Sequence, residues 1–169
     1  MTRSRCLSAL IALLTLAVAF LVAPSTAAAA VAFTSTGVNQ NGGNCLDLPG
    51  SSTTAGAQLR AFTCSSGANQ NFSFTPVSGT TDVYTITTQS GQCVDVYGAS
   101  TADNAAIIQW PCHGGTNQQW RLQDAGSGYL ELIARHSNKC LTIKDAATTD
   151  GALAVQMPCG SQQWQRQTV

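Results

Sequence analysis

Two groups of side chains recur at the same spacing, and each group combines a carboxylate, an aromatic ring and two amides. The groups are Asp47, Phe62, Asn69 and Gln70, and Asp95, Trp110, Asn117 and Gln118. An ionised Asp accepts strong hydrogen bonds from hydroxyls, and Asn and Gln amides both donate and accept. A flat ring covers an apolar C–H face with a large area and few rotatable bonds. Together these side chains suit a neutral ligand with several hydroxyls, such as a sugar.

Each group accompanies a pair of cysteines that stand 19 positions apart, and such a pair occurs three times. The pairs are Cys45/Cys64, Cys93/Cys112 and Cys140/Cys159. Each pair opens in a Cys-Leu or Cys-Val run and is followed by a Gln-x-aromatic triplet: Gln70–Phe72, Gln118–Trp120 and Gln162–Trp164. The chain is therefore an internal triplication. The repeat predicts one disulfide within each copy, each contributing about 3 kcal/mol, whereas zinc ligation is disfavoured because no CxxC pair exists.

The third copy lacks the side chains that define the two groups. Thr142 replaces the Asp, Met157 replaces the ring and Ser161 replaces the Asn, and the interval from Cys159 to Gln162 is three residues shorter. Their joint loss indicates that the three side chains serve a common site rather than the fold. The triplet aromatics occur in every copy and are predicted to pack in the core: Phe72, Trp120 and Trp164.

The first thirty residues have the pattern of a secretory signal peptide. Arg3 and Arg5 precede an apolar run over residues 7–23, and Ala28–Ala30 fits a small-x-small cleavage site. An uncleaved anchor is the competing interpretation, but the run is shorter than the roughly 20 residues of a spanning helix. Cleavage removes Cys6 and leaves six cysteines, as expected for a secreted, disulfide-bonded protein with no membrane contact.

Residues 31–169 have the length of a single domain, and their charge excludes some partners. The chain has eight Lys and Arg and eight Asp and Glu. Two arginines lie in the leader, so the remainder has a formal charge of −2. There is no basic patch for a phosphate backbone, so we expect no nucleic-acid partner.

Short β-strands joined by turns are the predicted elements. Residues 83–88 and 129–133 are rich in β-branched and aromatic residues, and Gly, Asn and Ser interrupt the chain at short intervals. Eleven residues after each first cysteine stand Gly56, Asn104 and Gly151, residue types that tolerate positive φ. A unit of about 45 residues cannot bury its own apolar face, so three units are expected to pool theirs in a barrel. A three-bladed propeller is the competing arrangement, although propellers usually have four or more blades.

With its three cysteine frames and Gln-x-aromatic triplets, the sequence resembles the ricin B-type lectin domain, a β-trefoil carbohydrate-binding family. The resemblance implies an all-β, pseudo-threefold β-trefoil with repeats at about 33–76, 77–124 and 125–169. It also implies that the two groups hold sugar, with two further candidates beside them. These are His113 near the second group and Arg60 near the first.

Departures from the family pattern rank the two groups. The family often has Gln two residues before the site aromatic, where this chain has Arg60 and Ile108. Arg60 could donate to a hydroxyl and Ile108 could not, but Phe62 offers a smaller face than Trp110 and no polar edge. The second repeat is predicted to be the better site. Structural roles stay open for the two Asp residues as turn formers, for Trp110 as core and for His113 as a loop residue.

Intrinsic catalysis is not expected, and no catalytic residue, cofactor or metal is assigned. The only tempting carboxylate pair, Asp47 and Asp95, falls in different repeats, too far apart for the separation of about 5–10 Å that glycoside hydrolysis needs. We expect a monomeric, extracellular protein that binds galactose- or xylose-type glycans. The alternatives are a protein-binding module, such as an inhibitor of a secreted hydrolase, and a structural exoprotein with degenerate sites.

Overall fold

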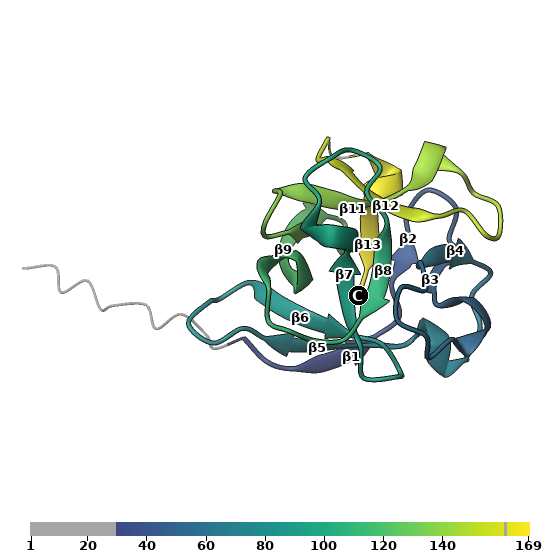
Figure 1. Ribbon diagram of the computed structural model, residues 1–169. Helices are drawn as coiled ribbons and strands as arrows, with labels where there is room; N and C mark the ends of the chain where they lie inside the picture. The colour runs from purple at the N-terminus through teal and green to yellow at the C-terminus, as the bar shows by residue number, and fades with distance from the viewer. Residues whose placement is uncertain (1–29, 161) are drawn as a thin grey trace, which may run out of the picture.

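The computed structural model describes residues 30–160 and 162–169 (Figure 1). The predicted signal peptide, residues 1–30, therefore lies outside the described part of the chain except for Ala30. Within the described ranges, no helix is long and apolar enough to cross a membrane.

The described residues form thirteen short strands and six single-turn 3-10 helices. The first repeat contains β1 (Phe33–Ser35), β2 (Val38–Asn39), β3 (Cys45–Asp47), η1 (Pro49–Ser51), β4 (Arg60–Phe62), η2 (Ala68–Gln70) and β5 (Phe72–Pro76). The second contains β6 (Val83–Thr87), β7 (Cys93–Val96), η3 (Tyr97–Ala99), β8 (Ile107–Trp110), η4 (Thr116–Gln118) and β9 (Gln119–Gly126). The third contains β10 (Tyr129–Ala134), β11 (Lys139–Ile143), η5 (Lys144–Ala146), β12 (Ala154–Pro158), η6 (Gln163–Gln165) and β13 (Arg166–Thr168).

Antiparallel pairing closes the outer strands into a barrel. The order is β1-β5-β6-β9-β10-β13-β2, and β1 and β2 are consecutive segments of one chain, so the ring has no free edge. Figure 1 shows β1, β5 and β6 side by side along one side of this ring. The remaining strands form one hairpin per repeat: β3–β4, β7–β8 and β11–β12. This arrangement confirms the predicted β-trefoil.

The three hairpins meet one another with threefold regularity. Isolated β-bridges join Gln58 to Ile108, Ala106 to Val155 and Leu153 to Arg60. The predicted left-handed positions are confirmed, with φ of 88° at Gly56, 62° at Asn104 and 88° at Gly151. Their backbone N–H groups donate to carbonyls of a neighbouring repeat: those of Gln109, Gln156 and Ala61 respectively. The same turn therefore links each repeat to the next.

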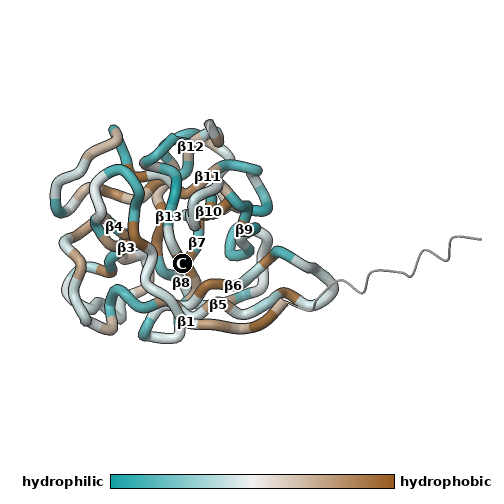
Figure 2. The backbone as a smooth tube through the Cα atoms, turned by 180° about the vertical axis from the view of Figure 1, so that it is seen from behind, coloured by the Kyte–Doolittle hydropathy of each residue, from teal (hydrophilic) through white to brown (hydrophobic). Residues whose placement is uncertain are grey.

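The core is built from equivalent positions of the three repeats. Leu48, Val96 and Ile143 lie at the end of the first hairpin strand of each repeat and are 1% exposed or less. They belong to one buried cluster that also contains Phe72 and Trp120, which confirms the core role predicted for these two aromatics. Figure 2 shows the most hydrophobic stretches along strands and hydrophilic stretches in several outer loops.

Each predicted disulfide is formed within its own repeat. The bonds are Cys45–Cys64, Cys93–Cys112 and Cys140–Cys159, each with a sequence separation of 19. In each bond the first cysteine is buried and the second is exposed. The bond ties the start of the hairpin to its end, next to the chain segment that carries the glutamine.

The predicted position of the third glutamine is wrong, because Gln165 rather than Gln162 is equivalent to Gln70 and Gln118. In every repeat the glutamine ends a 3-10 turn, and its Oε1 accepts from the N–H that follows the second cysteine, at 2.7–2.9 Å. Its Nε2 donates to the carbonyl that precedes that cysteine, at 2.8–3.0 Å. We call this pair of hydrogen bonds the glutamine clamp. In each repeat the clamping glutamine stands six residues after the second cysteine, so the interval that follows Cys159 is not shortened. Trp164 precedes the clamping glutamine instead of following it by two.

This register puts Gln167 at the position of Phe72 and Trp120. Gln167 is 1% exposed, and within the described ranges neither polar atom of its side chain has a partner. We expect Gln167→Leu, which is similar in size, to raise the free energy of unfolding by about 1–3 kcal/mol, the cost of an unpaired buried amide. Urea denaturation measures the change. Gln165→Leu is the matched control and should lower the unfolding free energy, because it breaks the clamp at Cys159; stabilisation by both would contradict the register.

Candidate functional site

Asp95 is the centre of the second group, and both of its amide partners bond the same carboxylate oxygen. It lies in β7, directly opposite Ile108 of β8, and is 2% exposed. Asn117 Nδ2 and Gln118 Nε2 both donate to its Oδ2, at 3.0 and 2.8 Å. Among the described residues, no donor reaches Oδ1. The carboxylate therefore keeps one oxygen free to accept hydrogen bonds from a ligand.

Burial raises the pKa of the Asp95 carboxyl above its ordinary value of 3.8. The hydrogen bonds from Gln118 and Asn117 and the nearby His113 ring act in the opposite direction and offset part of this rise. Hydrogen bonds to a partly desolvated carboxylate are stronger than the same bonds in water. A hydroxyl that reaches Asp95 thus meets a strong acceptor.

Gln118 stands behind the carboxylate rather than beside the free oxygen. Its Nε2 hydrogens are used by Asp95 and the Pro111 carbonyl, and its Oε1 accepts from the N–H of His113. Gln118 is 1% exposed, as is Gln70. The structure therefore gives these two predicted site residues a positioning role, in which they orient an Asp and clamp a cysteine.

Trp110 and Tyr97 are the exposed rings of the second repeat. Trp110 ends β8 and is 39% exposed, and a Cβ built on Gly56 would lie 3.7 Å from its Cζ3 atom, so a turn of the first repeat backs the indole. Tyr97 begins η3 and is 61% exposed. Sequence reasoning missed Tyr97, although a signal existed. Four residues after the first cysteine stand Pro49, Tyr97 and Lys144, and only the second repeat has a ring there.

An open pocket of about 380 Å³ lies between these side chains. It is lined by Asp95, Tyr97, Gly98, Ala99, Ile108, Trp110, His113 and Asn117. The predicted members Asp95, Trp110, Asn117 and His113 are thus brought together on one surface. Gly98 and Ala99 both have positive φ, and this turn lets the chain reverse and line the pocket next to Tyr97.

His113 lies at the rim of the pocket. Its Nε2 is 3.5 Å from Asp95 Oδ2, and its Nδ1 accepts from the N–H of Gly115 at 3.1 Å. This contact assigns the proton of the neutral ring to Nε2, the nitrogen that faces the carboxylate. His113 is thus placed as a donor at the pocket, as a ligand with hydroxyl acceptors requires.

The first group is also assembled, but a side chain of its own fills it. Asp47 Oδ1 accepts from Asn69 Nδ2 at 2.6 Å and Gln70 Nε2 at 3.1 Å. Asp47 Oδ2 accepts from Arg60 Nε at 2.7 Å. The Arg60 guanidinium carbon lies 4.3 Å from the centre of the Phe62 ring. Both carboxylate oxygens and one ring face are therefore engaged within the protein.

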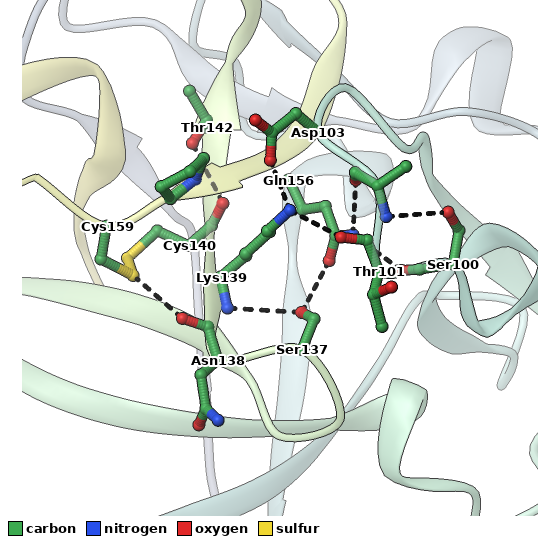
Figure 3. A network of polar contacts seen from close by, with 12 residues as sticks. Ser100, Thr101, Asp103, Ser137, Asn138, Lys139, Cys140, Thr142, Gln156 and Cys159 are labelled. Atoms are coloured by element: carbon green, nitrogen blue, oxygen red, sulfur yellow. Dashed lines mark hydrogen bonds and ion pairs between the residues drawn. A yellow bond between two sulfur atoms is a disulfide. The ribbon is translucent and has the colours of Figure 1, made fainter.

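The equivalent surface of the third repeat has different chemistry. A second pocket, also of about 380 Å³, is lined by Asn104, Thr142, Lys144, Asp145, Ala146 and Met157. Thr142 Oγ1 donates to the Cys140 carbonyl and accepts from Gln165 Nε2, so its hydroxyl is used internally. Figure 3 shows the adjoining network, in which Lys139 pairs with Asp103 and Gln156 Nε2 donates to the Ser100 carbonyl. Thr142 stands at the position of Asp95 and Met157 at the position of Trp110, so this pocket has neither that carboxylate nor that ring.

Comparison with known families decides where this architecture belongs. The family model for the ricin-type beta-trefoil lectin domain-like family matches residues 31–110 and 68–157. The chain belongs to this family. The matched ranges together contain both groups, the hairpins of the first two repeats, and the third hairpin up to Met157. A comparison with curated proteins found no match.

Similar solved structures agree with the fold. The designed three-fold symmetric protein ThreeFoil is 37% identical, with a TM-score of 0.77 over 80% of this chain and 96% of that one. An exo-beta-1,3-galactanase from Clostridium thermocellum is 29% identical, with a TM-score of 0.75 over 79% of this chain, but the match spans only 29% of the galactanase. The Macrolepiota procera ricin B-like lectin, solved with lactose, is 19% identical, with a TM-score of 0.68 over 80% of this chain and 93% of that one, and shares the fold.

Proposed function

We propose that this protein is secreted, has no catalytic activity of its own, and binds neutral saccharides of the galactose or xylose type in its second-repeat pocket. Membership of the lectin-like family supports carbohydrate binding in general. The observation that carries the finer proposal is the buried Asp95, which lines a pocket with two exposed rings and whose Oδ1 has no donor among the described residues.

The proposed binding mode uses each side chain for one feature of a sugar. Hydroxyls donate to Asp95 Oδ1 while the C–H face of the ring packs on Trp110, with Tyr97 as a second apolar wall. His113 Nε2–H donates to a further hydroxyl. Such open single sites bind weakly, and a millimolar Kd corresponds to about −4 kcal/mol.

Three further observations support the remaining parts of the proposal. The leader pattern of residues 1–30 supports export. Among the described residues, Asp95 is the one acidic residue that lines the second-repeat pocket, whereas glycoside hydrolysis requires a pair of carboxyl groups. The first group is the other predicted sugar site, but its carboxylate and ring are already engaged, so the proposal rests on the second repeat.

Co-sedimentation with insoluble polysaccharide tests this function. The protein without residues 1–30 is mixed with xylan or galactan, and the unbound fraction is measured with and without free xylose or galactose. We expect retention on at least one polymer, competition by the matching free sugar, and no release of reducing sugar. Folded protein that stays in solution with both polymers and binds nothing on a glycan array would refute the proposal. Retention on a protease column that sugar does not compete would instead favour the protein-binding alternative.

A further inference from the structure

Arg60 and Ile108 occupy equivalent positions in the first and second groups, but one is charged and long and the other is apolar. Arg60 is directly opposite Asp47 in the β3–β4 pair, and Ile108 is directly opposite Asp95 in the β7–β8 pair. Each is also two residues before the ring of its group on the same strand, so both side chains lie on the same face of the hairpin. The residue at this position therefore contacts whatever lies between carboxylate and ring.

In the first repeat, the arginine takes the contacts that a sugar would need. Its Nε donates to Asp47 Oδ2 at 2.7 Å, and its planar guanidinium stacks on Phe62 at 4.3 Å. Asn69 and Gln70 use the other carboxylate oxygen. A neutral sugar would have to displace a charged donor from a carboxylate that is 1% exposed.

In the second repeat, the isoleucine leaves the same contacts open. Ile108 has no donor. Asn117 and Gln118 donate to Asp95 Oδ2, the His113 ring lies 3.5 Å from the same oxygen, and among the described residues no donor reaches Oδ1. The Trp110 ring is 39% exposed, and Ile108 itself becomes an apolar part of the pocket lining.

We infer that Arg60 closes the first repeat by occupying its carboxylate and ring in the manner of a ligand, so that the chain has one open Asp–ring site instead of two. The residue opposite the Asp decides whether a repeat accepts a neutral sugar. This inference rests on the proposed function for its sugar readout, but the closed state itself can be measured without sugar.

Titration of the folded chain with lactose and with xylobiose, followed by the amide NMR signals of every repeat, tests the inference. In the unsubstituted protein, shifts should be confined to residues 95–99 and 110–117. Arg60→Ile, which copies the second repeat, should add shifts at residues 47–51 and 62–69 and raise the number of sites per chain from one to two. Arg60→Gln, shorter and uncharged, should give the same gain, and the control Arg135→Ile should not, because Arg135 bonds Gln119 outside the pocket.

The reciprocal change tests the same rule in the other repeat. Ile108→Arg should place a guanidinium opposite Asp95 and weaken second-repeat binding by at least about 10-fold. The Arg60 Nε–H signal provides the sugar-independent measurement: in the unsubstituted protein it should exchange with water at least about 10-fold more slowly than in Asp47→Asn.

The outcomes separate this inference from the proposed function. First-repeat shifts in the unsubstituted protein at the sugar concentration that shifts the second repeat would overturn the inference and leave the function standing, as would Arg60→Ile with no new shifts. If only Arg60→Ile binds sugar, the inference holds and the second-repeat function fails. If neither protein binds any sugar, the function fails, and rapid exchange of Arg60 Nε–H then overturns the closure while slow exchange upholds it.

Discussion

Replacing Trp110 by Ala is expected to weaken sugar binding by about 30-fold, or about 2 kcal/mol, and to abolish most retention on polysaccharide. The indole is the larger of the two rings in the pocket and covers an apolar sugar face that no other described side chain of the second repeat can replace. Tyr97 lines the same pocket, but its ring is smaller than the indole. Co-sedimentation and NMR titration measure the loss.

The stability of the Trp110→Ala variant should be almost unchanged, and this separates a binding role from a packing role. Trp110 is 39% exposed and is not part of the buried cluster, whereas Trp120 is fully buried within it. Leu153→Ala is the matched control, because Leu153 is also exposed, at 42%, but does not line the pocket. Retention that survives Trp110→Ala would remove this residue from the site, and a large drop in the urea midpoint would assign it to the core.

Replacing Asp95 by Asn should weaken sugar binding by roughly 10- to 100-fold, because a charge-assisted hydrogen bond contributes about 1.5–3 kcal/mol. Asn keeps the shape of the side chain, and Asn117 and Gln118 can still donate to its oxygen. Asp47→Asn is the matched control: the first-repeat carboxylate is engaged by Arg60, so this change should leave the second-repeat affinity as it was. Equal losses from the two substitutions would show that both repeats bind.

The same carboxylate makes binding dependent on pH. Burial raises the pKa of Asp95 above 3.8, so the ionised acceptor is lost at a higher pH on acidification than for an exposed Asp. Sugar affinity should therefore fall as pH is lowered through this raised pKa, and Asp95→Asn should remove that part of the dependence. The effect on folding has the opposite sign. Because the folded pKa exceeds the unfolded one, ionisation of Asp95 lowers the unfolding free energy as pH rises from about 4 through the folded pKa.

The two groups show that the same residue types can have opposite outcomes within one chain. Asp47 and Asp95 have the same amide partners and the same strand position. One carboxylate has both oxygens engaged by side chains of its own repeat, and the other has one oxygen left over. The difference lies in the residue that the hairpin pairs with each Asp. This residue is the long, charged Arg60 in the first repeat and the apolar Ile108 in the second.

The amino-acid sequence by itself determined the architecture and the members of both groups. Constant cysteine spacing fixes which thiols are close, because each pair closes the same loop, and Gly56, Asn104 and Gly151 mark the turns that join the repeats. These features are local or repeated, so agreement among the three copies supports each assignment. The spacing from Asp95 to Trp110 and Asn117 likewise repeats that of the first group, so the candidate site could be predicted without a structure.

Tertiary structure alone decided which group is open, which glutamine is the clamp and which additional ring lines the pocket. Arg60 closes its repeat because strand pairing puts it opposite Asp47 and above Phe62 at once, a coincidence of two contacts that spacing does not specify. Gln162 and Gln165 are both plausible in sequence, and only the hydrogen bonds on either side of Cys159 distinguish them. Tyr97 faces the pocket because the next two residues adopt positive φ. In each case the deciding feature is a contact or a backbone angle that strand pairing and turn geometry set and that residue types and spacing do not specify.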